Sequence, residues 1–257
     1  VRDVLIEKAS QGVEVRVIYD DVGCWHVPNR FFEEMRNAGI EVRSFLKVRF
    51  PLFTSRVNYR NHRKIVVIDG RIGFVGGMNL AERYMRGFSW GIWRDTHILI
   101  EGKAVHGLQT AFLLDWYFVD RTLITASRYF PKIESCGSSL VQVVTSEPIG
   151  PWKEIMQGLT MAINGAKKYF YMQTPYFLPT EQVLAAMQTA ALAGVDVRLM
   201  LPERADNRIT HLGSHSYLAD VMQAGVKVYF YKKGFLHSKL TVSYTHLRAH
   251  ETGRNLV

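Results

Sequence analysis

The chain has 257 residues, of which 47% are hydrophobic and 21% are charged, a composition that excludes an intrinsically disordered protein. It contains no run of about 18 uncharged apolar residues, so it predicts no membrane span, and its two cysteines, Cys24 and Cys136, form no CxxC pair, which argues against a zinc site or a disulfide framework. The formal net charge of +9 favours a polyanionic partner, either nucleic acid or an anionic lipid surface.

The first 45 residues predict alternating helices and strands. Residues 1–11 predict a helix, and residues 13–19 (VEVRVIY) predict a strand. Residues 28–38 predict a second helix, which ends at Gly39 and leads into a further strand. Alternation of this kind indicates a mostly parallel sheet flanked by helices, the α/β class.

Residues 61–79 (NHRKIVVIDGRIGFVGGMN) predict a strand, a turn and a second strand. Side chains repeat every two residues along a strand, so His62 and Lys64 are expected on one face, with the imidazole beside the ammonium group. Asp69 and Gly70 predict a hairpin turn. Asp69 is therefore a candidate catalytic residue that also has a structural explanation.

The end of this motif predicts a place where a ligand comes close to the backbone. Gly76 and Gly77 carry no side chain to obstruct a ligand, and the amide of Asn79 could face an oxyanion. Arg60, just before the motif, and Tyr176, in the second half of the chain, complete the candidate substrate-binding residues.

The rest of the chain continues the α/β pattern. Residues 104–119 (AVHGLQTAFLLDWYFV) are too short for a membrane span and contain Asp115, so a buried helix over the sheet is expected. Further elements are a strand at 140–146, a helix at 152–166, a strand at 168–173, a helix from Thr180 to Gly194, a strand at 195–201 and a helix at 214–224.

Three segments of the chain recur in the same order, which indicates an internal duplication. GVEVRVIYD (12–20) matches GVDVRLML (194–201), AGIEVRSF (38–45) matches AGVKVYFY (224–231), and NHRKIVVI (61–68) matches LHSKLTVS (236–243). The duplication predicts a first half at 1–130, with its motif at 62–79, and a second half at 131–257. His237 and Lys239 would repeat His62 and Lys64, and a pseudo-two-fold axis would bring both pairs to one site.

The duplication is uneven at both ends. The second half contains a strand–helix–strand unit ahead of the helix that matches residues 1–11, so we expect a comparable segment before Val1 in a longer parent protein. The second motif is partial and covers 237–243, because Tyr244 stands where an aspartate is expected. Residues 244–257 are atypical and show no strand alternation.

Two imidazoles and two ammonium groups suit transfer of a phosphoryl-type group. One imidazole can attack phosphorus and form a covalent intermediate, while the other protonates the leaving alkoxide and then activates the acceptor. The lysines and Asn79 would stabilise charge on the non-bridging oxygens. This chemistry needs no metal and no cofactor. His211 and His215 are four residues apart, but no third ligand is evident, so zinc is not expected.

These residues resemble the phospholipase D superfamily, whose signature is HxK, four residues and Asp, followed by G(S/G)xN. The resemblance is strongest to the bacterial cardiolipin synthases, and nearly all of residues 1–243 take part in it. The segments that carry it are GVEVRVIYDDVG, NHRKIVVIDGRIGFVGGMNLAERY, WRDTH, QTPYFLPTEQV, LPERADNRITHLGSHSY and GFLHSKLTVS.

The resemblance implies two pseudo-symmetric phospholipase-D-like halves around one active site. It also implies transfer of a phosphatidyl group between two phosphatidylglycerol molecules with release of glycerol, with His62 as nucleophile and His237 as acid. Relatives place a carboxylate after the first motif to hold the histidine, so Asp95 is the expected partner of His62. The alternative for Asp95 is an ordinary surface pair with Arg94.

The resemblance further implies an enzyme of the bacterial inner membrane, with membrane helices ahead of a catalytic part that is cytoplasmic or lies at the membrane face. Residues 41–71 are rich in arginine and lysine, with aromatic residues between them, which suits an anionic membrane surface; the alternative is that the aromatic rings pack into the core.

Two other functions remain open on the sequence alone: a phospholipase-D-type phosphodiesterase or nuclease, and an inactive lipid-binding fragment. Phosphatidylglycerol is the expected ligand and nucleic acid the less expected one. No oligomeric state is predicted.

Overall fold

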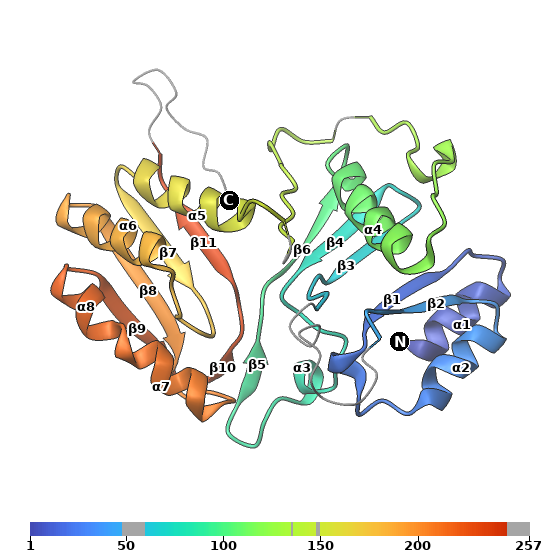
Figure 1. Cartoon of the computed structure of the whole chain (residues 1–257), viewed down its shortest axis with the longest axis horizontal. Coiled ribbons are helices and arrows are strands. Elements are labelled where there is room, and N and C mark those ends of the chain that lie inside the picture. The colour runs from blue at the N-terminus through green and yellow to red at the C-terminus, as the bar shows by residue number, and fades with distance from the viewer. Residues whose placement is uncertain (48–59, 135, 148–149, 246–257) are drawn as a thin grey trace. The chain divides into compact units, whose positions relative to one another are not determined.

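The computed structural model describes residues 1–47, 60–134, 136–147 and 150–245 of the chain (Figure 1). The chain folds into two compact units. Unit 1 contains Val1–Phe74 and Leu99–Cys136, and unit 2 contains Val75–Ile98 and Gly137–Val257. The duplicated halves predicted from the sequence meet after residue 130. The compact units of the structure have a different boundary, because residues 75–98 belong to the second unit.

The N-terminal part of unit 1 is a parallel strand pair packed against two helices. Its elements are α1 (Arg2–Ser10), β1 (Arg16–Asp20), the short 3-10 helix η1 (Val22–Cys24), α2 (Asn29–Asn37) and β2 (Glu41–Phe45). The strands β1 and β2 are parallel, as the sequence predicts. Phe32 and Met35 of α2 pack with Ile40 and Val42 in a small buried cluster. Burial of these side chains fixes the helix on the strand pair.

A second sheet, in the order β3-β4-β6, carries the first motif. Its strands are β3 (Ile65–Ile68), β4 (Ile72–Gly76) and β6 (His97–Glu101). The helix α4 (Val105–Asp120) buries Leu108 and Trp116 and packs over this sheet, since a side chain at Gly73 of β4 would meet Leu108 at 2.7 Å. The predicted helix over the sheet is confirmed. A 3-10 helix, η3 (Ser127–Tyr129), follows.

The predicted turn between the two strands of the motif is confirmed. Asp69 and Gly70 have φ angles of +52° and +63°, and the amide of Arg71 donates to the carbonyl of Ile68 at 3.0 Å. Positive φ at both central residues defines a type I′ turn, which matches the twist of a hairpin. His62 and Lys64 were predicted on the strand itself, but both precede β3, which begins at Ile65.

Unit 2 is built on a four-stranded sheet in the order β11-β7-β8-β9. The strands β7, β8 and β9 are parallel, and β11 is antiparallel to β7. The elements are α5 (Glu154–Gly165), β7 (Tyr169–Gln173), α6 (Glu181–Leu192), β8 (Asp196–Pro202), α7 (Arg208–Ser216), α8 (Leu218–Gln223), β9 (Lys227–Tyr231) and β11 (Leu240–Ser243). The order strand, helix, strand confirms the α/β prediction.

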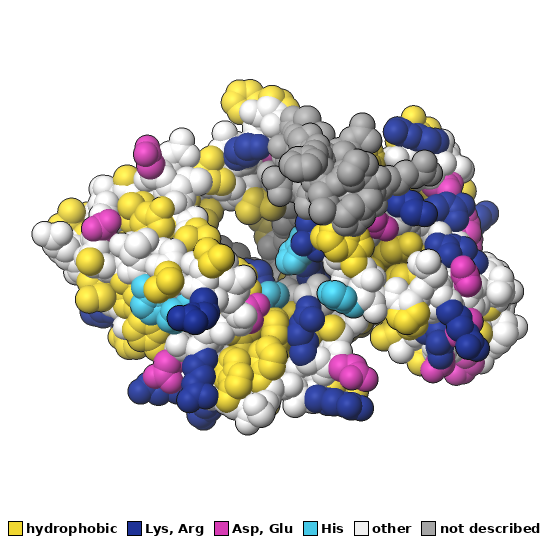
Figure 2. Space-filling view, turned by 60° about the horizontal axis from the view of Figure 1, so that its bottom comes forward, with side chains coloured by type: hydrophobic (Ala, Val, Ile, Leu, Met, Phe, Trp, Pro, Cys, Tyr) yellow, Lys and Arg dark blue, Asp and Glu magenta, His cyan; other side chains and the backbone are white. Residues whose placement is uncertain are grey.

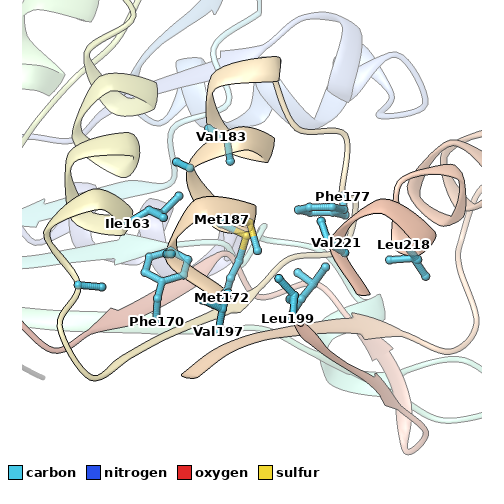
Figure 3. Packing of buried hydrophobic residues seen from close by; sticks show 14 of the residues in the cluster. Ile163, Phe170, Met172, Phe177, Val183, Met187, Val197, Leu199, Leu218 and Val221 are labelled. Atoms are coloured by element: carbon cyan, nitrogen blue, oxygen red, sulfur yellow. The ribbon is translucent and has the colours of Figure 1, made fainter. Parts of the chain in front are cut away.

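The core of unit 2 lies between this sheet and its helices (Figure 3). Phe170 and Leu199 of the sheet are fully buried, as are Ile163 of α5, Met187 of α6 and Val221 of α8. The predicted start of α6 is also confirmed, because the Thr180 hydroxyl accepts a hydrogen bond from the amide of Val183 at 3.4 Å. Such a cap satisfies one of the free amides at a helix start.

Two predicted elements of the second half differ from the structure. Residues 140–146 form neither helix nor strand, and Leu140, Val141 and Val144 are exposed. Their strand propensity has no effect because, among the described residues, no strand pairs with them. The helix predicted at 214–224 is instead two helices: α7, capped by the Asn207 side chain, ends at Ser216, and α8 begins at Leu218.

The sheet of unit 2 continues one residue beyond the second motif. The amide of Tyr244 donates to the carbonyl of Tyr169, and the carbonyl of Tyr244 accepts from the amide of Lys167. Most of the atypical C-terminal segment (246–257) lies outside the described residues, as do residues 48–59 of the predicted basic and aromatic membrane segment.

A separate two-stranded parallel pair positions the functional residues of unit 2. It joins β5 (Ile92–Arg94) to β10 (Gly234–Leu236), with Ile92 opposite Gly234 and Arg94 opposite Leu236. Gly234 has a φ of +143°, and a side chain there would collide with the carbonyl of Ile92. A glycine is therefore required for the two strands to approach this closely. The short helix α3 (Arg83–Arg86) precedes β5.

Candidate active site

The pairing of β5 with β10 brings together two polar side chains that are 142 residues apart in the sequence. The amide of His237 donates to the carbonyl of Arg94 at 2.7 Å, which extends the pairing by one step. His237 Nδ1 then lies 2.6 Å from Asp95 Oδ2, and the side chains of the two residues are 8% and 0% exposed. A buried imidazole thus meets a fully buried carboxylate.

The structure corrects the partner predicted for Asp95. Asp95 was predicted to contact His62, whereas it pairs with His237. The reason is the register of β5 on β10, which sequence spacing could not supply. The alternative of a surface pair with Arg94 is also wrong, because the Asp95 side chain has no exposed surface.

Asp95 is held in its charged form. Burial disfavours the carboxylate, but hydrogen bonds from His237 and from the amide of Thr96, together with the nearby charge of Lys239, outweigh burial and lower the pKa of Asp95. An ionised carboxylate accepts the Nδ1 proton of the imidazole. This assignment leaves Nε2 of His237 available for proton transfer or for attack on phosphorus.

Lys239 lies against the same imidazole, with its Nζ 3.0 Å from Nδ1 of His237. Its Nζ is 2.9 Å from His237 Nε2 and donates to the carbonyl of His237 at 2.8 Å. Although the side chain keeps exposed surface, surrounding protein atoms disfavour the charged form, and this burial lowers the pKa of Lys239 to about 8 against the opposing effects of Asp95 and Asp206. An ammonium group at this place could contact an oxygen of a phosphodiester that approaches Nε2.

The histidine–lysine geometry recurs in unit 1. Lys64 Nζ donates to the carbonyl of His62 at 2.7 Å, just as Lys239 donates to the carbonyl of His237. In each unit the histidine and the lysine immediately precede a strand, β3 or β11. The duplicated sequence motif therefore has a duplicated local structure.

Tyr84 is a site residue that the sequence analysis missed. Its hydroxyl lies 3.0 Å from His237 Nδ1 and 3.3 Å from Asp95 Oδ2, and it accepts a hydrogen bond from Asn79 Nδ2 at 3.1 Å. Burial is the main cause that raises the pKa of Tyr84, so the hydroxyl stays protonated. The signal was present in the sequence as a tyrosine five residues after Asn79, but only the fold shows where it points.

The candidates at the end of the first motif reach the same cluster in a different way than predicted. Asn79 was expected to face an oxyanion, but its amide donates to Tyr84. Gly77 was expected to admit a ligand, but the space beside it is taken by Asp95, whose Cγ would lie 2.7 Å from an added Cβ. At Gly76 an added Cβ would meet the backbone of Thr96 and His97. These glycines permit close packing around Asp95.

Aromatic rings surround His237. The ring centroids of Trp93 and Phe235 are 5.2 and 5.8 Å from that of His237, and the Arg83 guanidinium lies 4.9 Å over Trp93. The candidate Tyr176 lies 6.4 Å from Phe235, ring to ring, and its hydroxyl donates to the carboxylate of Asp206 at 2.8 Å. Burial and Asp206 raise the pKa of Tyr176.

The remaining candidates belong to unit 1. His62 is exposed, and the segment that carries it is fixed to α4, because Asn61 donates to Asp115 at 2.7 Å. Arg60, predicted to bind substrate, forms an ion pair with Asp20 at 2.6 Å. Asp69 occupies the exposed turn. Catalytic roles for His62, Lys64 and Asp69 stay predictions.

Within the described residues, no group of three or more histidine, cysteine, aspartate or glutamate side chains is arranged to hold a metal ion. The rings of His211 and His215 lie 4.0 Å apart, and the part of the chain that the structure describes supplies no third such side chain to them. None of the helices in the described part of the chain has the length and apolar character needed to cross a bilayer.

Comparison with known proteins agrees with the fold. A family model described as "Cardiolipin synthase, PLD-like domain" matches residues 1–116 and 159–247. The chain therefore belongs to this family of phospholipase-D-like proteins.

Two curated relatives show the extent of the similarity. The chain is 45% identical over 245 residues to a protein named cardiolipin synthase from Geobacillus thermodenitrificans, covering 94% of the chain and 49% of that relative. It is 42% identical over 246 residues to the major cardiolipin synthase ClsA of Bacillus subtilis, covering 94% of the chain and 51% of the relative. The chain thus spans about half the length of these relatives.

Among solved structures, a phosphatidylserine synthase from Haemophilus influenzae matches with a TM-score of 0.58 at 12% identity, covering 95% of this chain and 73% of that one. At this identity the match supports the fold alone.

Proposed function

We propose that this chain carries the catalytic part of a phosphatidyltransferase, which condenses two phosphatidylglycerol molecules into cardiolipin and releases glycerol. The observation that carries the proposal is the buried Asp95–His237 pair with the Lys239 ammonium beside Nε2. The names of the relatives support the same reaction, since each is called a cardiolipin synthase.

The proposed reaction has two steps. In the first, Nε2 of one histidine attacks the phosphorus of phosphatidylglycerol, the bond from phosphorus to the glycerol oxygen breaks, and the second histidine gives its proton to that oxygen. In the second, the terminal hydroxyl of another phosphatidylglycerol loses its proton to the second histidine and attacks the phosphohistidine. The first histidine is released unchanged, and the products are cardiolipin and glycerol.

The proposed roles follow from the residues around each histidine. By the family resemblance, His62 is the nucleophile and His237 is the acid and base. Asp95 would accept a hydrogen bond from Nδ1–H of His237, so that Nε2 is the nitrogen that exchanges a proton with the glycerol oxygen. Lys239 and Lys64 would stabilise charge on the non-bridging oxygens of phosphorus. Asp69 is proposed to act mainly through its turn.

The proposed setting is an anionic membrane surface. Both substrates are phospholipids, so the enzyme must reach a headgroup without extracting the lipid. The location we propose for the parent protein is the bacterial inner membrane, with the catalytic part cytoplasmic or at the membrane face, as the family resemblance implies. The net charge of +9 supports contact with anionic headgroups.

The test is to follow the products from phosphatidylglycerol in mixed micelles by mass spectrometry. The proposal expects cardiolipin and glycerol in equal amounts from the native chain, and loss of both in His237→Ala and Asp95→Asn. The matched control is His106→Ala, a substitution in α4 outside the candidate residues, which should react as the native chain does.

The other candidate functions give different results in the same assay. A phospholipase-D-type hydrolase would use water as acceptor and produce phosphatidic acid with no cardiolipin. A nuclease would cleave a DNA or RNA phosphodiester, as the net positive charge could also favour, and leave the lipid intact. If micelles bind but no product forms in the native chain, the chain is a lipid-binding fragment and the transferase proposal is wrong.

A further inference from the structure

The helix α7 presents an unusual apolar surface in unit 2. Its inner face is fixed by Ser214, whose buried hydroxyl accepts a hydrogen bond from the amide of Phe177 at 2.9 Å. On the outer face, Ile209 and Leu212 are 80% and 68% exposed and, being three positions apart, lie side by side. Leu178, 53% exposed, borders them at Gly213, where an added Cβ would meet it at 2.9 Å. We call Leu178, Ile209 and Leu212 the apolar ridge.

Basic side chains accompany the ridge. Arg204 is exposed on the segment that leads into α7. Arg208, the first residue of α7, is also exposed and lines a surface depression with His211 and Leu212. Among the described residues, no acidic side chain forms an ion pair with Arg208. Figure 2 brings the lower edge of Figure 1 forward and shows hydrophobic, histidine and basic side chains together on the left of the view. The surface is therefore apolar at its centre, and Arg204 and Arg208 lie at its border together with the exposed carboxylates of Glu203 and Asp206.

The ridge is joined to the candidate active site through contacts inside unit 2. Asp206, two residues before α7, accepts hydrogen bonds from Tyr176, and the Tyr176 ring lies beside Phe235, whose ring lies 5.8 Å from that of His237. The segments that follow the parallel strands β7 and β8 supply both Tyr176 and Asp206. Carboxyl ends of parallel strands share one edge of a sheet, so ridge and site belong to the same edge.

We propose that the apolar ridge and its two arginines dock unit 2 on the surface of a bilayer that contains anionic lipid. Exposed leucine and isoleucine side chains gain free energy when they enter the boundary between headgroups and acyl chains, and arginine beside them favours negative headgroups. The inference rests on the proposed function, because a lipid phosphodiester reaches His237 without leaving the bilayer only if the membrane lies at this edge.

The test measures binding of the intact chain to sedimenting vesicles, either of phosphatidylcholine alone or with about one-third phosphatidylglycerol. The double variant Ile209→Ser with Leu212→Ser should lose about tenfold or more in affinity for both vesicle types. The matched control replaces Met161 and Leu192, each 74% exposed on α5 and α6, with serine and should bind as the native chain does.

Charge is tested separately. Arg204→Gln with Arg208→Gln should remove most of the preference for vesicles that contain phosphatidylglycerol, about three- to tenfold at physiological salt. The control is Lys167→Gln, another exposed basic residue of unit 2, which should keep this preference. Because all these side chains are exposed, thermal midpoints should remain those of the native chain.

The outcomes separate this proposal from the transferase proposal. Turnover of dispersed short-chain phosphatidylglycerol should be unchanged in the ridge variant. If the native chain binds vesicles through the ridge yet makes no product, the surface stands and the transferase proposal fails. If the ridge variant binds vesicles as tightly as the native chain, the docking proposal is overturned. The docking proposal is also overturned if the ridge substitutions change only the oligomeric mass of the protein in solution. The ridge then contacts a second copy of this chain.

Discussion

At the scale of single residues, the hydroxyl of Tyr84 is the feature that links the first motif to His237. It contacts His237 Nδ1, Asp95 and Asn79, while the Tyr84 ring packs 5.4 Å from Trp93. Tyr84→Phe keeps the ring and removes the hydroxyl. We expect the transfer rate to fall about three- to tenfold with KM unchanged, since the Asp95 carboxylate that positions the imidazole loses one hydrogen bond.

The control for Tyr84→Phe is Tyr171→Phe. The Tyr171 hydroxyl bonds to Asp196 at the start of β8, away from the cluster. The dependence of the transfer rate on pH should differ from that of the native chain in Tyr84→Phe and should match it in Tyr171→Phe. Initial rates between pH 5 and 9 at roughly unit intervals would measure this. Equal rate losses in both variants would mean that Tyr84 only supports the fold.

Lys239 provides a second prediction for a single residue. Burial lowers its pKa to about 8, so the ammonium loses its proton within the working pH range. Because the charged form stabilises negative oxygens, kcat/KM should fall about tenfold per pH unit above this value. Lys239→Arg remains protonated at all these pH values, so its rate should be lower at pH 7 but should not fall between pH 8 and 10 on account of this group.

The same shift predicts how stability depends on pH. The folded pKa of Lys239 lies below the unfolded one, so the folded chain binds fewer protons between about pH 8 and the usual lysine range. The contribution of Lys239 to the free energy of unfolding therefore rises with pH across this window. Replacing Lys239 by methionine should flatten that rise in urea titrations; an unchanged slope would contradict the shift.

At the scale of elements, the turn between β3 and β4 offers a way to distinguish a structural role of Asp69 from a catalytic role. Asp69 has a φ of +52°, a conformation that asparagine also adopts readily. Asp69→Asn should therefore keep both stability and transfer rate within about twofold of the native chain. A loss of activity without a loss of stability would instead show that the carboxylate takes part in the reaction.

A substitution at Gly70, in the same turn, is expected to destabilise the fold. Its φ is +63°, and an added Cβ would lie 2.6 Å from the carbonyl oxygen of Tyr129 and 2.7 Å from Pro131. Gly70→Ala combines backbone strain with a clash against backbone, so the free energy of unfolding should fall by about 2 kcal/mol or more. Chemical denaturation of the whole chain would measure this loss of stability.

The loop between β4 and α3 depends on Gly77 in another way. An added Cβ would meet the carboxylate of Asp95, which is fixed by His237. Gly77→Ala should displace Asp95 and lower the transfer rate by about 10² while most of the fold remains. The matched substitution is Gly158→Ala on the exposed side of α5, where nothing lies within 4 Å; it should raise helix stability by about 0.5–1 kcal/mol and leave the rate unchanged.

Elements with strong local signals could be predicted from the sequence. The Thr180 cap of α6 and the glycines that follow α2 and α6 are local signals, and both helices were predicted within a few residues. The strand predicted at 140–146 was wrong because strand formation needs a partner that propensity does not reveal. The pairing of β5 with β10 was missed for the same reason, and this pairing decides which histidine Asp95 contacts.

At the scale of the whole molecule, the boundary between the duplicated sequence halves differs from the boundary between the two compact units. The repeats in the sequence predict two halves, and the lysine-to-carbonyl bonds at His62 and His237 repeat in the two units. Compactness nevertheless assigns residues 75–98 to unit 2, because β5, Tyr84 and Asp95 pack around β10. Candidate residues of the first motif could be predicted from sequence, but the unit that holds each of them could not.

This division predicts how a fragment would behave. The segment 137–257 contains the whole core cluster around Phe170 and Leu199 but lacks β5, so Phe235 would lose the Trp93 ring that lies 4.6 Å from it. Hydrogen exchange should show protected amides in β7 and β8 and an unprotected amide at His237, whose acceptor in the full chain is the carbonyl of Arg94. Adding a peptide of residues 75–98 should restore that protection, whereas the same peptide with Gly91→Val should not, because a side chain there would meet Gly234 at 2.6 Å. Equal protection of His237 in the fragment and in the full chain would mean that β10 does not need β5, and that Asp95 is not what holds the histidine in place.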